Sequence, residues 1–157
     1  MSYPRLDTIP LFKGLTNEDL DLLAKSLELE SFPDETLIFN QGDPADKLYI
    51  LVSGKVAIRF KPEDGEILTV TEVEEGGVFG WSSALGRRSY TSCAVCLADS
   101  QSLSIHGDEL RRLCSTHPET GVVILERLAE VIAERLTNTH KHVIEMLRQG
   151  MRTSAEP

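Results

Sequence analysis

The residues with the clearest chemical potential lie in one glycine- and serine-rich stretch, Gly76–Thr91. Three glycines within the first five residues permit backbone conformations and a close ligand approach that a Cβ would block. Ser82 or Ser83 can cap a single helical turn that Gly86 ends, so that amide groups at the start of this turn face outward. Oriented amides, hydroxyls and a nearby guanidinium are what recognition of a phosphate or another small anion requires. A plain surface turn is the alternative for such a stretch taken alone.

The other reactive side chains do not form a catalytic or metal site. Cys93 and Cys96 lie within one expected strand, where positions three apart face opposite sides, so they are ordinary cysteines rather than a redox pair. His140 and His142 lie two apart on an expected helix and share no face. No arrangement of serine, histidine and aspartate, and no carboxylate pair, stands out. We therefore expect no enzyme activity and no metal.

Composition limits the class of protein. With 157 residues, 41% of them hydrophobic, the chain has room for one domain and little for a second core. The formal net charge of -9 argues against a direct nucleic-acid partner. No signal peptide and no run of about 18 apolar residues is present, and only three cysteines occur. These features predict a soluble cytoplasmic protein without a membrane partner.

The sequence around the glycine-rich stretch predicts a mainly β domain with flanking helices. Apolar residues at helical spacing, with Thr16 placed as N-cap, predict a short amphipathic helix over about Asn17–Ser26. The strands expected after it are Thr36–Phe39, Leu48–Val52, Val56–Phe60, Ile67–Val73, Ser92–Leu97 and Leu103–Ile105. Many short strands joined by close turns indicate an antiparallel sandwich or jelly roll.

Beyond Gly107 the pattern is helical. A short helix around Leu110 and Leu113 stops at His117-Pro118, and a long helix runs from Glu119 to about Arg148. The apolar a/d register of this long helix consists of Val122, Leu125, Ala129, Ile132, Leu136, Thr139, Val143 and Met146. A second apolar line, with Ile124, Leu128 and Val131, occupies the first half only.

This pattern predicts how the long helix packs. We expect its first half to lie between the β-roll and a partner helix and its second half to pair with a copy of itself. A lone amphipathic helix folded back on its own domain is the alternative. The polar tail 149–157 is expected to be disordered.

Several motifs in the right order resemble the cyclic-nucleotide-binding domain. They are Ile9–Phe12 with Gly14, Leu15 and Leu20, then Ile38–Val56, then Gly77–Gly80. The chain looks most like the sensory half of the catabolite-activator (Crp/Fnr-like) regulators, over about residues 7–148. The resemblance implies a jelly-roll β-sandwich with flanking helices, in which the last helix forms a parallel coiled-coil dimer. We expect one domain over 1–148, with the first helix and β-roll at 7–117 and the long helix at 118–148.

In this family the glycine-rich stretch is the phosphate-binding cassette, which consists of Phe-Gly-Glu, a short helix, and an arginine followed by small residues. The glutamate accepts a hydrogen bond from the ribose 2'-hydroxyl, and the arginine neutralises the cyclic phosphate. Here Trp81 stands where the glutamate is expected and Tyr90 where the arginine is expected. Arg87 and Arg88 lie within a few positions, and a shorter loop would bring either to the phosphate. Thr139 matches the helix residue that meets the base in the family.

The resemblance therefore implies a ligand site in which both defining polar contacts have changed. The candidate binding residues are Gly80, Trp81, Ser82, Ser83, Arg87, Arg88, Tyr90, Thr91 and Thr139. Two lost charge-assisted hydrogen bonds, each worth about 1.5–3 kcal/mol, would weaken binding by roughly two to four orders of magnitude. We expect cyclic AMP to bind weakly or not at all, and the ligand to be a cyclic nucleotide or another small anion.

The predicted function is that of a non-enzymatic, dimeric sensor module without an effector domain of its own. Ligand in the cassette would move the hinge after Leu113 and alter the pairing of the long helix, which an unknown protein effector then reads. Two alternatives stay open. The chain is either a ligand-free dimeric adaptor, or the sensory fragment of a Crp/Fnr-like regulator that lacks its DNA-binding domain.

Overall fold

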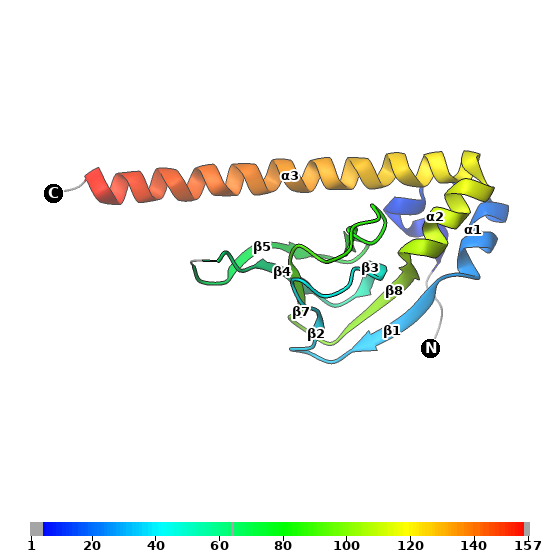
Figure 1. Ribbon diagram of the computed structural model, residues 1–157, viewed down its shortest axis with the longest axis horizontal. Helices are drawn as coiled ribbons and strands as arrows, with labels where there is room; N and C mark the ends of the chain where they lie inside the picture. Colours follow the sequence, from blue (N-terminus) through cyan, green and yellow to red (C-terminus); the bar gives the residue numbers. More distant parts are fainter. Residues whose placement is uncertain (1–4, 64, 156–157) are drawn as a thin grey trace.

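The structure, a computed structural model, describes residues 5–63 and 65–155 and consists of a β-roll with helices on one side (Figure 1). The strands are β1 Glu28–Phe32, β2 Leu37–Phe39, β3 Lys47–Ser53, β4 Val56–Phe60, β5 Leu68–Val73, β6 Val78–Phe79, β7 Cys93–Cys96 and β8 Ser100–His106. The helices are the 3-10 turns η1 Leu6–Thr8 and η2 Pro10–Phe12, then α1 Asn17–Ala24, α2 Gly107–Thr116 and α3 Pro118–Ala155.

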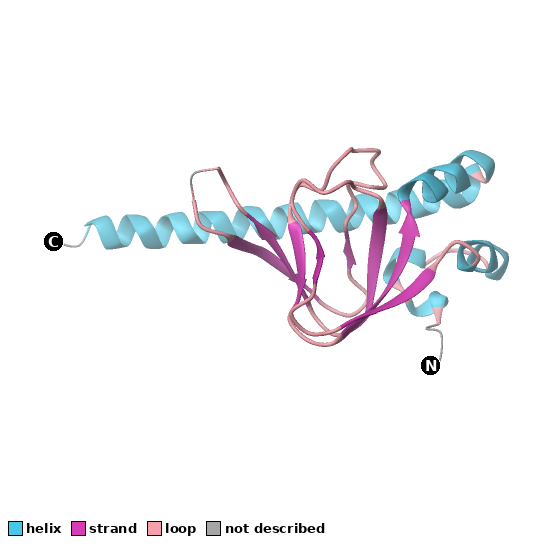
Figure 2. Ribbon diagram, turned by 60° about the horizontal axis from the view of Figure 1, so that its bottom comes forward, coloured by secondary structure: helices cyan, strands magenta, loops and turns pink. Residues whose placement is uncertain are grey.

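The strands form two four-stranded sheets, with the orders β1-β8-β3-β6 and β2-β7-β4-β5 (Figure 2). Every strand pair is antiparallel. Strands that are distant in sequence, such as β1 and β8, pair as neighbours in these sheets. The expected mainly β jelly roll with flanking helices is confirmed.

The alternating pattern of β3 builds two cores at once. Leu48 and Ile50 join the cluster beneath the helices, whereas Tyr49 and Leu51 join the cluster between the two sheets. This division follows from the two-residue period of a strand, which sends successive side chains to opposite faces. One sheet is thus covered by helices on one face and by the other sheet on its other face.

The first helix is fixed to the start of the last one. Thr16 caps α1, as expected, and forms a reciprocal capping box with Asp19. The other carboxylate oxygen of Asp19 accepts a hydrogen bond of 2.6 Å from the Thr120 hydroxyl on α3. This hydrogen bond is the main reason why the pKa of Asp19 is lowered. The contact anchors the N-terminal end of α3 beside α1.

Helix α3 runs along one side of the roll, and its C-terminal end extends beyond it (Figure 1). Ile124 and Leu128 are fully buried in the core beneath the helices, as expected for the second apolar line. The helix continues to Ala155, past Arg148, where we expected it to end and a disordered tail to begin. No proline occurs between these residues, and the single Gly150 costs only about 1 kcal/mol in a helix.

Candidate functional site

The cassette consists of one helical turn that follows β6. The amides of Ala84 and Leu85 both donate to the carbonyl of Trp81. The turn ends in a Schellman motif, because Arg87 donates to the Ser82 carbonyl and Gly86, at φ +74°, donates to the Ser83 carbonyl. The predicted turn and its end at Gly86 are confirmed.

The expectation that Ser82 or Ser83 caps this turn is wrong. The Ser83 hydroxyl instead donates to the Gly80 carbonyl at 2.9 Å. The Ser82 hydroxyl has no hydrogen-bond partner among the described residues, although the residue is only 6% exposed. Within the same part of the chain, the amides of Trp81 and Ser82 also donate to no protein acceptor. Three donors at the start of the turn are therefore unpaired.

Gly80 allows the turn to begin directly at the sheet. Its φ is +75°, and a Cβ there would lie 2.9 Å from the carbonyl oxygen of Lys47 and 3.2 Å from the ring of Tyr49. A side chain at this position would therefore be strained in its backbone and would clash with β3. The close approach brings the cassette amides to the edge of the roll.

Tyr90 occupies the position where the resemblance places the family's arginine, and it is part of the core. It is 5% exposed, and its ring stacks on Phe39 with 3.7 Å between ring centroids. Its hydroxyl donates to the Lys47 carbonyl at 2.6 Å and accepts from the Lys47 amide at 3.0 Å. Burial raises the pKa of Tyr90, so the phenol stays neutral. This position supplies an aromatic wall and no charge.

Trp81, where the glutamate is expected, faces a cation from α3. The guanidinium carbon of Arg135 lies 4.6 Å from the centroid of the Trp81 ring. Trp81 also packs against the core beneath the helices. Burial lowers the pKa of Arg135 to about 10, which leaves the side chain charged at neutral pH. The stacked pair connects the cassette to the long helix.

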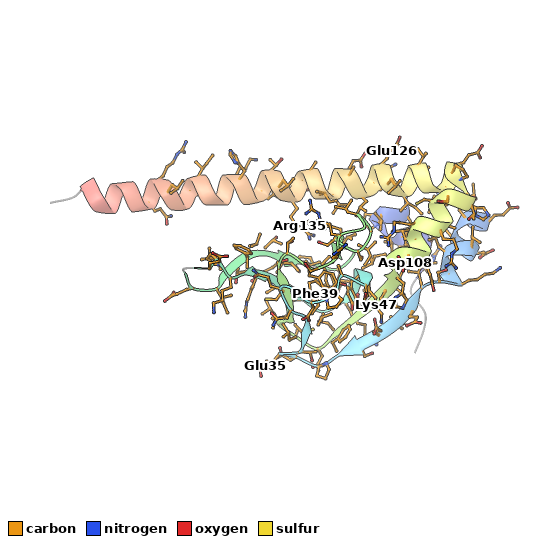
Figure 3. All side chains as sticks on the ribbon, in the orientation of Figure 1. Glu35, Phe39, Lys47, Asp108, Glu126 and Arg135 are labelled. Atoms are coloured by element: carbon orange, nitrogen blue, oxygen red, sulfur yellow. The ribbon has the colours of Figure 1, made fainter. Side chains whose placement is uncertain are left out.

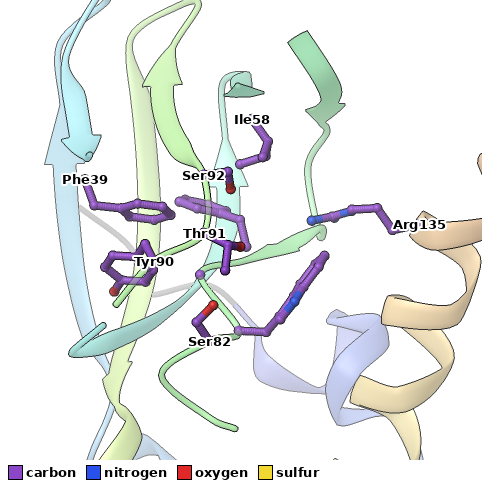
Figure 4. Close-up of a pocket in the computed structure, with 10 residues that line it drawn as sticks. Phe39, Ile58, Ser82, Tyr90, Thr91, Ser92 and Arg135 are labelled. Carbon is purple, nitrogen blue, oxygen red and sulfur yellow. The ribbon is translucent and has the colours of Figure 1, made fainter. Parts of the chain in front are cut away.

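A small pocket lies between the cassette, the roll and α3 (Figure 4). Its lining residues are Phe39, Ile58, Phe79, Gly80, Trp81, Ser82, Tyr90, Thr91, Ser92 and Arg135. In Figure 4, Arg135 reaches from α3 toward the roll, and the rings of Phe39 and Tyr90 lie on the opposite side. The volume of this partly open pocket is about 40 Å³, whereas a pocket for a drug-sized ligand measures roughly 300–1,000 Å³. In this conformation the pocket is too small for a nucleotide.

The structure brings together five of the nine residues predicted from the sequence. Gly80, Trp81, Ser82, Tyr90 and Thr91 all line the pocket. The buried Ser83 does not line it, since its hydroxyl and carbonyl are used within the protein.

The structure does not place the other three predicted residues, Arg87, Arg88 and Thr139, at the pocket. Arg87 and Arg88 are exposed and absent from the lining, because the Schellman motif turns the chain away after Gly86. Thr139 belongs to α3, but its side chain lies outside the described part of the structure.

Sequence reasoning missed Arg135 as a pocket residue, although a signal for it exists. The second apolar line of α3 passes through Leu128 and Val131, and its next position, four residues on, is Arg135. A charged residue on a line that faces the core marks a charge held near the interior. Such a charge is more often functional than a solvated one.

The cassette also contacts the helix that leads into α3. Arg111 of α2 donates to the carbonyl of Ser83 and forms an ion pair with Asp108. Gly107, the first residue of α2, lies so close that a Cβ there would be 2.2 Å from the same carbonyl oxygen. A shift of the cassette turn would therefore displace the start of α2.

No cysteine or histidine among the described residues lines this pocket. Cys93 is partly exposed and Cys96 buried, which confirms that they face opposite sides of β7. Among the residues that the structure describes, no three histidine, cysteine, aspartate or glutamate side chains are placed to hold a metal ion. In the same residues, no helix is both long and apolar enough to cross a membrane.

Comparison with known proteins identifies a matching family. Residues 29–117 match the family described as the cyclic nucleotide-binding domain. The chain is 31% identical over 137 residues to a CRP-like cAMP-activated global transcriptional regulator of Mycobacterium tuberculosis, which covers 87% of this chain and 59% of that protein. The chain thus spans less than two thirds of the length of this relative.

Solved structures share the fold. A putative cyclic nucleotide-binding protein from Geobacter metallireducens is 31% identical, with a TM-score of 0.76, and the match covers 87% of this chain and 99% of that one. A cyclic nucleotide-binding domain from Methylobacillus flagellatus has a TM-score of 0.80 at 21% identity, covering 89% of this chain and 79% of that one. The three chains therefore share one fold.

Proposed function

Since this chain belongs to the cyclic nucleotide-binding domain family and resembles the sensory half of CRP-like regulators, we propose that it is a non-enzymatic regulatory module that has lost tight binding of cyclic AMP. The observation that carries this proposal is the buried Tyr90, which fills the place of the family's arginine with a neutral aromatic ring. Trp81 supplies no acceptor for a ribose hydroxyl. The nucleotide therefore has neither of the two polar contacts that define the cassette.

The signal proposed for this module runs from the pocket to α3. Two contacts support it, namely the Trp81–Arg135 stack and the hydrogen bond from Arg111 to the Ser83 carbonyl. Between α2 and α3 only His117 departs from helical geometry, with φ -130° and ψ 73°. A ligand that separates Arg135 from Trp81 changes how α3 lies on the roll, and this hinge absorbs the movement.

The proposed output is a change in a homodimer that pairs through α3 and is read by a protein effector. The apolar stripe on the outer side of α3 supports this part of the proposal, because Val122, Leu125 and Leu136 are each more than 40% exposed in the single chain. Direct binding of DNA is not part of the proposal, given the net charge of -9.

A second candidate is a ligand-free dimeric adaptor. The pocket volume of about 40 Å³ favours it, since Arg135 and Trp81 already occupy the space between cassette and helix. In that case the stack holds α3 permanently in one position. The two candidates differ in whether any small molecule changes the state of Trp81.

Isothermal titration calorimetry with cyclic AMP tests the proposal. We expect the wild-type protein to give no heat of binding or a dissociation constant well above about 1 µM, the equivalent of roughly -8 kcal/mol. Trp81→Glu should bind cyclic AMP more tightly than wild type, because it adds the ribose acceptor and removes the indole. Trp81→Ala is the matched control, since it opens the same space without adding a carboxylate.

The outcomes separate the causes. If Trp81→Glu gains affinity and Trp81→Ala does not, the missing acceptor explains the loss. Equal gains in both variants would mean that the indole only blocks the site. A wild-type dissociation constant at or below about 1 µM would show that the two polar contacts are dispensable, and the proposal would be wrong.

A further inference from the structure

The C-terminal half of α3, residues 137–155, has apolar residues that the predicted dimer seam does not use. The seam positions in this half are Thr139, Val143 and Met146. Ile144 and Leu147 occupy neither an a nor a d position, and they are 37% and 62% exposed in the single chain. They lie three residues apart, so they are neighbours on one face of the helix. This apolar face therefore lies beside the seam and is not its centre.

Basic residues border this apolar face. Lys141 and Arg148 lie three residues before and four residues after Ile144, and both are exposed. Arg152 has the next place along the same line of the sequence. The one acidic residue of the segment is Glu145, and no described carboxylate lies within ion-pair distance of Lys141 or Arg148. The C-terminal half of α3 therefore has an excess of positive charge, in a chain whose formal net charge is -9.

An apolar face bordered by cations fits an amphipathic helix that has acidic residues beside its own apolar line. Such a helix can follow α3 along its length, because both helices present side chains at the same three- and four-residue spacing. Its carboxylates would reach Lys141 and Arg148, whereas basic residues would be repelled. Nucleic acid fits less well, because the acidic remainder of the chain repels phosphates and the apolar residues Ile144 and Leu147 offer them no contact.

We propose that the C-terminal half of α3 is the docking surface for an acidic amphipathic helix of the protein effector. In this surface Ile144 and Leu147 are the apolar anchors, and Lys141 and Arg148 form the ion pairs. The inference rests on the proposed function, because it gives the chemistry of the effector which that function requires. Since the docking surface and the dimer seam occupy different positions around one helix, the effector binds the dimer without separating its two chains.

Two synthetic peptides test the chemistry of the partner. Both are amphipathic helices of about 20 residues with leucine at the apolar positions, and their flanking positions are glutamate in one peptide and lysine in the other. Each peptide is labelled with fluorescein, and its binding to the full chain is measured by fluorescence anisotropy. We expect saturable binding of the acidic peptide, at least about 10-fold tighter than that of the basic peptide and weaker at high salt.

Two double variants test the residues of the docking surface. Ile144→Ala with Leu147→Ala should weaken binding of the acidic peptide about 10- to 100-fold, since alanine favours the helix but removes the apolar contact. Lys141→Gln with Arg148→Gln should weaken it about 3- to 10-fold at low salt, because two ion pairs are lost. At high salt this second effect should disappear, since exposed charges are then screened.

Leu37→Ala and Arg112→Gln are the matched controls, because Leu37 is an exposed apolar residue of β2 and Arg112 is an exposed arginine of α2. Both variants should bind the acidic peptide as the wild type does. Circular dichroism shows whether each variant is folded. Sedimentation equilibrium should give the variant with alanine at positions 144 and 147 the same mass as the wild type, since neither residue is a seam position.

Several outcomes would overturn the inference. One is the absence of binding by the acidic peptide, and another is equal affinity for the two peptides. Tight binding of a labelled random-sequence DNA duplex in place of the acidic peptide would assign the basic residues to nucleic acid. A lower mass of the double alanine variant would assign Ile144 and Leu147 to the pairing of two copies. The loss of tight cyclic AMP binding is tested separately by calorimetry, so it stands or fails independently of these results.

Discussion

At the scale of single residues, Tyr90 shows how a changed binding position becomes part of the core. Its ring stacks on Phe39, and its hydroxyl satisfies both the amide and the carbonyl of Lys47. A buried polar group that loses its partner costs about 1–3 kcal/mol. The residue therefore contributes to folding as well as to the pocket wall.

Removal of the Tyr90 hydroxyl should be costly. We expect Tyr90→Phe to lower the free energy of unfolding by about 1–3 kcal/mol, measured by urea denaturation, because the Lys47 backbone loses two hydrogen bonds. Tyr49→Phe is the matched control. That tyrosine is also buried, but its hydroxyl has no hydrogen bond among the described residues, so the change should stay within about 0.5 kcal/mol. Equal losses in both variants would contradict the structural role given to Tyr90.

The same residue limits what the sequence could predict about the site. The position of the cassette, and its lack of the family's glutamate and arginine, follow from counting residues after Phe79. The consequence of Tyr90 does not, because its partners Phe39 and Lys47 lie more than 40 residues away in sequence. Tyr90→Arg would place a guanidinium inside an aromatic stack. Restoring the family motif at this position therefore conflicts with the packing.

At the scale of elements, prediction was reliable where a periodic pattern was strong. The expected strand Val56–Phe60 agrees with β4 at both ends, and α1 starts at Asn17 as predicted from its cap at Thr16. Strands β1 and β6 were not predicted. β1 has the sequence Glu-Leu-Glu-Ser-Phe at a sheet edge with no fully buried residue, and β6 contains two residues. Neither gives a period that can be recognised without its partner strand.

The start of α2 offers a test of the contact between cassette and helices. In an ordinary helix, Gly→Ala stabilises by up to about 1 kcal/mol. Gly107→Ala should instead destabilise by about 1–3 kcal/mol, because the added Cβ would lie 2.2 Å from the Ser83 carbonyl oxygen and 2.7 Å from its carbon. Thermal unfolding measures the sign directly.

Ser115→Ala is the control for Gly107→Ala, since Ser115 is an exposed position of the same helix. It should be neutral or slightly stabilising. If Gly107→Ala were as stable as this control, α2 would not be seated on the cassette turn. The proposed transmission through α2 would then lose its structural basis.

At the scale of the whole molecule, α3 has both buried and exposed apolar side chains. Ile124 and Leu128 face the roll and are fully buried. Val122, Leu125 and Leu136, from the predicted a/d register, are 54%, 44% and 63% exposed, and Leu147 near the end is 62% exposed. Side chains of the later register positions Thr139, Val143 and Met146 lie outside the described part of the structure. An apolar stripe along a helix that extends beyond its own domain is typical of a coiled-coil seam.

The last prediction follows from this stripe. Sedimentation equilibrium of the wild type should give about twice 17.4 kDa, and Leu136→Glu should shift the mass toward the monomer, because it buries an unpaired charge in the seam. Leu37→Glu is the matched control, since Leu37 is 50% exposed and belongs to β2, which lies away from α3 in Figure 1. The nearby Glu35 also lies far from α3 in Figure 3. It should leave the mass unchanged. A wild-type monomer at high micromolar concentration would contradict the dimer, and an equal effect of both variants would place the interface elsewhere.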